Sequence, residues 1–229
     1  MKRIEYLILG FLILILLSLG VWLIFNEFTI RRSSYIAGTP PENVRFMMLP
    51  QTIELAKMKP PAVRFTDPMR YGNNLSEATV VFFGDFNSPD SRATADILSK
   101  IISAYNGRVR LVWRDHPSLD DDKAMTAAIY TRCTAFQGKF WETYDILNTV
   151  TNPNETVYSG ITRELKLNSQ EIAACRKDQG IRQLIETDVK AAQNDGVNSV
   201  PFLFIGTEAH QGLIDESTLK EKIDTFLNS

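Results

Sequence analysis

Two serines follow an apolar run and begin a helical pattern, which makes them the first candidates for chemistry. The run over 80–83 predicts a buried strand, and after a short turn the chain continues with Ser88-Pro89-Asp90-Ser91. A serine hydroxyl before a proline can cap a helix by accepting a hydrogen bond from a backbone N–H group. It cannot attack a disulfide, because that step needs a thiolate. The four residues therefore predict a structural helix cap.

The other side chains with thiol chemistry are the two cysteines, Cys133 and Cys175, which lie about forty residues apart. Neither belongs to a C-x-x-C pair, so neither can carry out the usual two-thiol exchange alone. Two alternatives stay open. The two cysteines are free and buried as small hydrophobic side chains, or they form one disulfide between two helices. The disulfide would imply an oxidising compartment.

No pattern predicts a metal, a cofactor or a nucleic acid. His116 and His210 have no ligand-type residues at metal-site spacing, so we expect both to be solvated and the metal site to be absent. Residues 120–122 are all aspartate, but they lack calcium-loop spacing and predict a helix start. The net charge of −2 gives no electrostatic basis for binding nucleic acid.

Hydrophobic periodicity predicts an α/β fold. Apolar residues recur at helical spacing from Ala93 to Tyr105, and Val109–Trp113 predicts the next strand, so we expect a right-handed parallel βαβ unit. Residues 149–159 are polar with Pro and Asn, which predicts a loop. The other expected elements are strands at 62–66 and 202–205, a hairpin partner ending at 211–214, and helices starting at 120–122 and 168–171, over 181–195 and around 219–227.

Three motifs, in this order, resemble the DsbA-like thiol-disulfide oxidoreductases of the thioredoxin superfamily. They are FFGDFNSPDSR from Phe82, CTAFQGKFW from Cys133 and GVNSVPFLFIG from Gly196. The resemblance implies a thioredoxin-like core with an all-helical insertion at about 118–195, and a cis peptide bond before Pro201. It also implies that Cys133 and Cys175 form a disulfide. Serine occupies both cysteine positions of the C-P-x-C motif of that family, which leaves no catalytic pair.

A thioredoxin fold without its redox cysteines retains the peptide-binding groove beside the cis-proline. We expect an extended peptide to pair with the backbone of Val200 next to Pro201, with Phe86 as a wall of the groove. The predicted function is a redox-silent module that binds an unidentified protein or peptide, with degenerate motif positions Ser88, Pro89, Asp90 and Ser91. Two enzymatic alternatives remain: a transferase or isomerase similar to kappa-class glutathione transferases that uses Ser88, and a disulfide oxidoreductase that acts through Cys133 and Cys175.

The N-terminal part of the chain predicts a membrane anchor. Residues 1–5 form a short tail with two basic residues, and residues 6–25 carry no charge over a length that spans a bilayer as a helix. Bulky residues at the end of this run argue against a cleaved signal peptide. A juxtamembrane linker is expected at 26–60 and the DsbA-like domain at 61–229. We expect a single-pass protein of the cell membrane with its C-terminal domain outside the cytoplasm.

Overall fold

The structure is a computed structural model that describes residues 54–229. The predicted tail and anchor, and the predicted linker up to residue 53, lie outside the described residues. Within the described part, no helix is long and apolar enough to cross a membrane. Residues 55–229 form one compact unit, so the folded unit includes the last residues of the predicted linker. Leu55 and Met58 pack against one face of the sheet.

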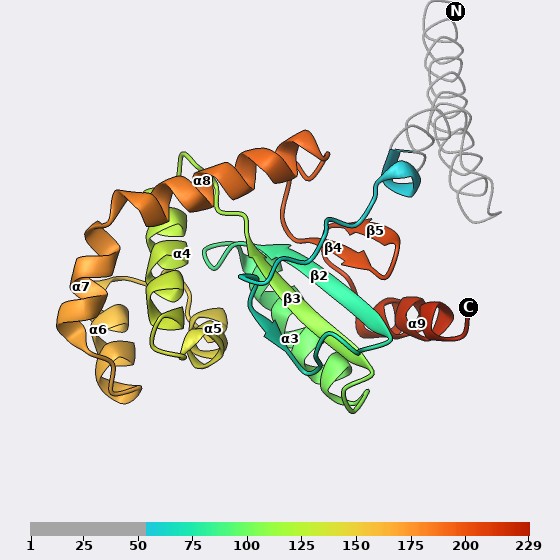
Figure 1. Cartoon of the computed structure of the whole chain (residues 1–229), viewed down its shortest axis with the longest axis horizontal. Coiled ribbons are helices and arrows are strands. Elements are labelled where there is room, and N and C mark those ends of the chain that lie inside the picture. The colour runs from blue at the N-terminus through green and yellow to red at the C-terminus, as the bar shows by residue number, and fades with distance from the viewer. Residues whose placement is uncertain (1–53) are drawn as a thin grey trace, which may run out of the picture. The chain divides into compact units, whose positions relative to one another are not determined.

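The described unit contains a mixed sheet and a set of helices between its third and fourth strands (Figure 1). The strands are β1 (Met69–Arg70), β2 (Ala78–Gly84), β3 (Val109–Asp115), β4 (Phe202–Ile205) and β5 (Glu208–Gln211). The helices are α3 (Pro89–Ser103), α4 (Asp122–Ala135), α5 (Phe140–Thr149), α6 (Glu155–Glu164), α7 (Ser169–Lys177), α8 (Gln179–Asn194) and α9 (Glu216–Leu227).

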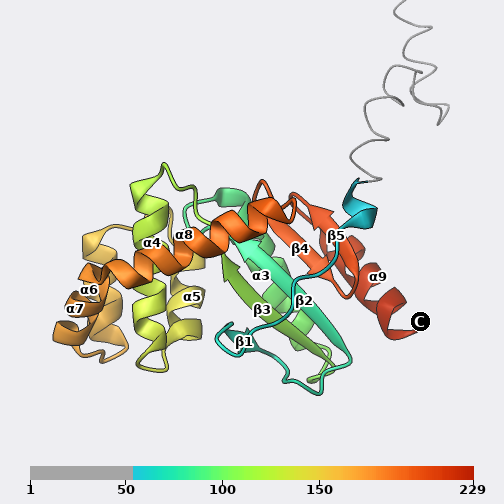
Figure 2. The ribbon, with the colours of Figure 1, turned by 45° about the horizontal axis from the view of Figure 1, so that its top comes forward.

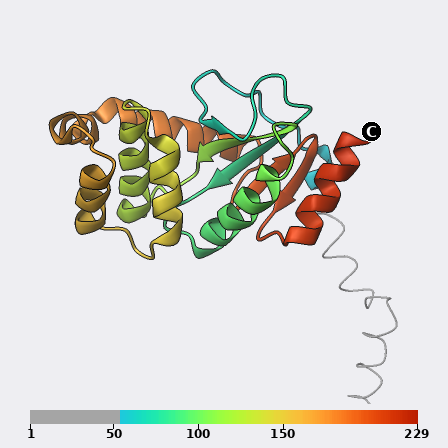
Figure 3. The ribbon, with the colours of Figure 1, turned by 90° about the horizontal axis from the view of Figure 1, so that it is seen from below.

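The sheet has the strand order β1-β3-β2-β4-β5. β2 and β3 are parallel and α3 connects them, as predicted, while the other pairs are antiparallel. Side chains alternate along β2: Phe82 lies in the core under α3 and α9, and Phe83 lies in a second cluster with Ala192 of α8. Helices therefore cover both faces, with α3 and α9 on one and α8 on the other (Figures 2 and 3).

The predicted strand at 62–66 is wrong, because these residues lead into a turn. The Asp67 carboxylate accepts hydrogen bonds from the backbone N–H of Arg64 (2.8 Å) and from its Nε (2.9 Å). The N–H of Asp67 donates in turn to the Arg64 carbonyl. Phe65 is 101% exposed, so this apolar residue of the alternating pattern at 62–66 does not pack against the core. The first strand is instead β1, which pairs with β3.

The loop predicted at 149–159 is also wrong in its second half, which belongs to α6. The Asn154 side chain caps this helix by accepting from the N–H groups of Thr156 and Val157. Tyr158 and Ile161 are its buried residues, and the Tyr158 ring lies 4.6 Å from that of Tyr130 on α4. The local residues are poor helix formers, so tertiary packing stabilises a helix that propensity did not indicate.

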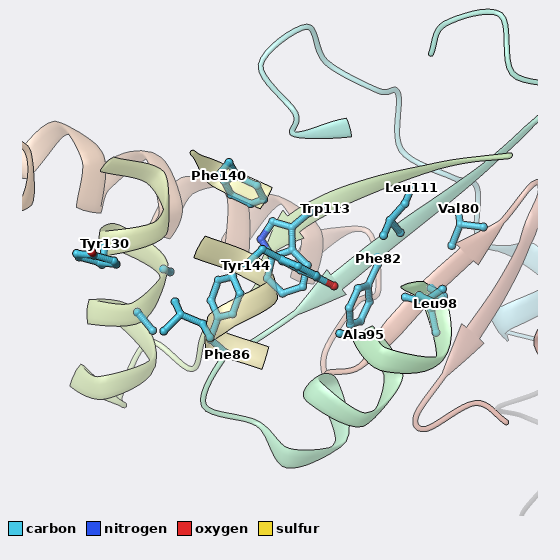
Figure 4. Close-up of a cluster of buried hydrophobic side chains, with 14 of the residues drawn as sticks. Val80, Phe82, Phe86, Ala95, Leu98, Leu111, Trp113, Tyr130, Phe140 and Tyr144 are labelled. Carbon is cyan, nitrogen blue, oxygen red and sulfur yellow. The ribbon is translucent and has the colours of Figure 1, made fainter. Parts of the chain in front are cut away.

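Aromatic side chains join the insertion to the sheet. Trp113 at the end of β3 packs against Phe86 (ring centroids 4.8 Å apart) and against Tyr144 of α5 (5.0 Å), as Figure 4 shows. Phe140 of the same helix is 5% exposed and lies beside this cluster, and the Trp141 Nε1 donates to the Met69 carbonyl at 2.8 Å. The FW pair of the second sequence motif therefore attaches the insertion to the core.

A buried ion pair makes the second connection between the insertion and the sheet. Asp115 at the end of β3 is 2% exposed, and its carboxylate accepts from Arg132 of α4 and from the Trp113 Nε1 (2.8 Å). The Arg132 side chain is itself only 11% exposed. A carboxylate at this depth is tolerated because it has charged and polar partners.

We predict that Arg132→Met destabilises the domain by about 3 to 5 kcal/mol, because it leaves Asp115 buried without its cation. Urea unfolding would show a lower midpoint with an unchanged slope. The matched control is the double variant Asp115→Asn with Arg132→Met, in which the buried charge is absent. This variant is expected to recover a large part of the loss. Equal losses in the single and double variants would contradict the prediction.

Candidate functional site

The turn between β2 and α3 is fixed by hydrogen bonds of its own serines. The Ser88 Oγ accepts from the Ser91 N–H at 3.2 Å, and the Ser91 Oγ accepts from the Asp85 N–H at 3.3 Å. Ser88 has extended backbone angles and Pro89 begins the helix, so the predicted helix cap is confirmed. The Ser91 side chain is buried and Ser88 is half-buried.

This turn is also tied to the insertion. The Asn87 Nδ2 donates to Asp121 at 2.6 Å, and the Asp121 carboxylate caps α4 by accepting from the Lys123 and Ala124 N–H groups. Arg92 on the first turn of α3 donates to the Phe86 carbonyl at 3.0 Å. The backbone of the turn is therefore held from α3 and from α4, which leaves it little freedom to rearrange around a ligand.

Phe86 does not form a wall of a peptide groove, which corrects the sequence prediction. It is 1% exposed, and its ring packs against both Trp113 and Tyr144, with centroids 4.8 Å and 5.8 Å away (Figure 4). A large aromatic ring gains more by burial in the gap between sheet and insertion than by lining a solvated surface. Phe86 therefore supports the turn from inside the core.

Carboxylates give the turn a negative electrostatic character. Burial raises the pKa of Asp85 above its ordinary value, and the carboxylates of Asp121 and Asp115 raise it further. Backbone N–H groups, including that of Asn87 at 2.7 Å, oppose this rise. Asp90 adds a negative charge in the first turn of α3. These groups disfavour a second anion, such as a thiolate, beside Ser88.

The loop before β4 lies next to this turn. Phe83 of β2 pairs with Phe202 of β4, so the residues after β2 and those before β4 meet at one end of the sheet. The peptide bond between Val200 and Pro201 is cis, as the resemblance implied. The Pro201 carbonyl accepts from the Gly212 N–H at 2.8 Å. Among the described residues, neither the N–H nor the C=O of Val200 has a hydrogen-bond partner.

His116 is buried, although the sequence predicted a solvated side chain. It is 6% exposed, its Nε2 lies 3.0 Å from the Val197 carbonyl, and its backbone N–H donates to the Gly84 carbonyl at 2.9 Å. The backbone N–H of His116 thus contacts the end of β2, and its imidazole contacts the Val197 carbonyl of the segment that leads to the cis-proline. One signal was present in the sequence: His116 directly follows a strand parallel to β2, and the carboxyl ends of parallel strands share one edge. His210 is half-buried in β5.

The two cysteines form a disulfide, so the alternative of two free thiols is wrong. Cys133 of α4 and Cys175 of α7 are bonded, with their Cα atoms 5.8 Å apart. Cys133 is 1% exposed. The bond closes a loop with a sequence separation of 42 and contributes about 3 to 4 kcal/mol in the chain-entropy model. No cluster of three or more potential metal ligands occurs among residues 54–229.

The fold agrees with the comparisons to known proteins. The family model described as Thioredoxin matches residues 65–225. This match covers well over half of the chain, so the protein belongs to the thioredoxin family. Its structural neighbours, at 21% identity, show that it shares the fold of DsbA-like proteins.

Solved structures of low sequence identity share the fold. A thioredoxin-like oxidoreductase from Silicibacter pomeroyi has a TM-score of 0.65 at 23% identity, covering 77% of this chain and 97% of that one. The thiol-disulfide exchange protein alpha-DsbA2 from Wolbachia pipientis has a TM-score of 0.63 at 21% identity, covering 80% and 96%. Pseudomonas aeruginosa DsbA2 has a TM-score of 0.59 at 21% identity, covering 72% and 96%.

The curated relatives are much longer than this chain. The Na⁺/H⁺ antiporter NhaA of Nitrosospira multiformis is 25% identical over 148 residues, which are 64% of this chain and 24% of the antiporter. NhaA 3 of Salinispora tropica is 30% identical over 146 residues, which are 62% of this chain and 22% of the antiporter. The match therefore spans about a quarter of these relatives.

We predict that His116 makes the stability of the domain depend on pH. Burial lowers the pKa of His116, and the Val197 carbonyl opposes this only in part. A lowered pKa means that the unfolded chain binds more protons, so stability is full above about pH 6.5 and falls as the pH decreases below it. The free energy of unfolding is expected to fall between pH 7.5 and pH 5, by at most about 1.4 kcal/mol per pH unit from this group.

The comparison uses His116→Phe, which keeps an aromatic ring beside Phe83 and removes the titrating group. Denaturant titrations across this pH range should show a flatter profile for that variant, even if it is less stable at pH 7.5. His210→Gln serves as the control and should keep the slope of the parent protein. If the dependence of the unfolding free energy on pH is the same in His116→Phe and in the parent protein, the assignment of this dependence to His116 is wrong.

Proposed function

We propose that this protein is a redox-silent DsbA-like module that binds an extended segment of a partner protein beside cis-Pro201 at a membrane surface. The observation that carries the first part is the use of both motif serines as hydrogen-bond acceptors within their own turn. A serine hydroxyl at each of these positions stabilises the start of α3. It cannot exchange electrons with a disulfide, because that reaction requires a thiolate.

The disulfide of the insertion offers no replacement for the missing pair. Cys133 is almost completely buried, and the two bonded cysteines lie on α4 and α7, which are packed helices. The alternative of a glutathione transferase or isomerase that uses Ser88 is disfavoured by Asp90 in the first turn of α3 and by the buried carboxyl of Asp85, since negative charge near this turn opposes a thiolate. No observation favours either enzymatic alternative over binding.

Peptide binding is supported by the unpaired backbone of Val200. Its N–H and C=O are the pair that strand addition requires, and Val200 itself is only half-buried. Hydrogen bonds from Gly212 to Pro201 and from the Gln211 side chain to the Ser199 Oγ (2.8 Å) hold this loop in place. Leu213, which is 55% exposed, follows Gly212 and adds an apolar side chain beside the loop.

The membrane location is proposed from the apolar run at 6–25, with the folded domain on the extracytoplasmic side. A disulfide between the two cysteines supports an oxidising compartment for the domain. The curated relatives are Na⁺/H⁺ antiporters, of which this chain matches about a quarter, and this supports a role beside membrane proteins. The partner in this proposal is a protein of unidentified sequence.

Redox silence is tested by insulin reduction. The parent protein is expected to show only the background rate with dithiothreitol and no saturable binding of glutathione by calorimetry. The double variant Ser88→Cys with Ser91→Cys is the positive control, because residues three apart at a helix start lie at disulfide distance. It is expected to accelerate the reaction. A parent rate well above background would overturn the proposal.

The binding surface is tested by Val200→Pro, which removes one backbone donor without adding charge. Crosslinked pull-downs from native membranes are expected to lose the bands captured by the parent protein. Leu184→Ala, at an exposed position of α8, is the control and should retain them. Circular dichroism would verify that both variants fold. Identical bands for parent and Val200→Pro would remove this loop from the account.

A further inference from the structure

A second surface of the protein, remote in sequence from the serine turn, has the composition of a ligand site. A hollow of about 540 Å³ opens between α6 and α7 in the insertion. These two helices lie side by side in every view (Figures 1, 2 and 3). The hollow contains no residue of the serine turn or of the cis-proline loop. Its size is within the range that small molecules occupy in proteins.

The lining of this hollow carries three cations. They are Arg163 in the last turn of α6, Lys166 in the connection that follows it, and Arg176 in the last turn of α7. The lining residues include no aspartate or glutamate. Within the described part of the chain, neither Arg163 nor Lys166 forms an ion pair. Their positive charges are therefore available to a ligand.

The third cation is positioned in advance. The Arg176 guanidinium lies over the rings of Tyr130 and Tyr158, 5.7 Å and 5.3 Å from their centroids, and it is paired with Glu155. The adjacent Cys175 is bonded to Cys133 of α4. Because Ile172 is the one buried residue of α7, this disulfide is a principal restraint on the helix that carries Arg176.

The uncharged residues of the lining add hydroxyl groups and an apolar surface to the three cations. Ser159 and Ser169 present hydroxyls that have no hydrogen-bond partner among the described residues, while Leu167 and Ile172 form an apolar floor. Arginine, lysine and two hydroxyls together supply more donors than a carboxylate can accept, and they suit the three terminal oxygens of a phosphate. The apolar floor suits the carbon part of an ester.

We propose that the hollow between α6 and α7 binds a phosphate ester, with Arg163 and Lys166 contacting the phosphate and Leu167 and Ile172 contacting its organic part. The ester belongs to a small metabolite or to a phospholipid headgroup, which share this chemistry. The site is independent of the proposed peptide-binding loop, because the two have no residue in common.

The test is calorimetry on the full chain in a neutral detergent at low ionic strength, titrated with glycerol 3-phosphate and with inorganic phosphate. Saturable binding of both is expected, and the ester should bind more tightly. Arg163→Ala with Lys166→Ala is expected to lower the affinity about tenfold or more, since two charged hydrogen-bonding groups are removed. Lys177→Ala, next to Arg176 on α7 but outside the lining, should change it less than about twofold.

A further variant separates a specific site from general attraction. Glu155→Gln removes the partner of Arg176 and is expected to tighten binding, because a third cation becomes available to the phosphate. Micelles doped with an anionic phospholipid distinguish the two sources: displacement of glycerol 3-phosphate assigns the site to a headgroup, and undisturbed binding assigns it to a soluble ester. Absence of saturable binding, or equal affinity in the parent and in Arg163→Ala with Lys166→Ala, would overturn the proposal.

Discussion

The charge of Asp115, buried at the end of a central strand, determines how the insertion packs on the sheet. A carboxylate that is 2% exposed requires partners, and Arg132 of α4 and the Trp113 indole provide them. Once α4 is held there, the gap between β3 and α5 is filled by the rings of Trp113, Phe86 and Tyr144. The candidate site follows from this arrangement, because Phe86 belongs to the turn that connects β2 to α3.

In the proposed relation to DsbA-like proteins, the serine turn keeps the position of a reactive site while the reactive atoms differ. The DsbA-like proteins that the sequence resembles have cysteine at both positions, and the helix N-terminus stabilises a thiolate there. Here each hydroxyl oxygen accepts a backbone N–H of the turn itself. The same positions therefore contribute to local stability, and the elements around them, including cis-Pro201 and the unpaired backbone of Val200, remain available for binding.

The insertion has a different relation to each of the two proposed surfaces. It supports the serine turn indirectly, through the Asn87–Asp121 hydrogen bond and the aromatic cluster. It forms the cationic hollow directly, from α6 and α7, with the disulfide restraining α7. A peptide-binding loop on the thioredoxin core and an anion site on the insertion are thus compatible in one domain.

The sequence by itself determined the βαβ unit, the helical insertion, the helix cap at Ser88 and the absence of a C-x-x-C pair, because these depend on local periodicity and residue identity. Motif resemblance added the cis-proline and the disulfide. Only the tertiary structure decided the burial of Phe86 and His116, the helix α6 and the turn in place of a strand at 62–66. The burial of Phe86 and His116 and the packing of α6 depend on contacts between residues distant in the chain, whose partners no local pattern can specify. The turn at 62–66 combines local hydrogen bonds between Arg64 and Asp67 with a distant one from Arg64 to Asp188.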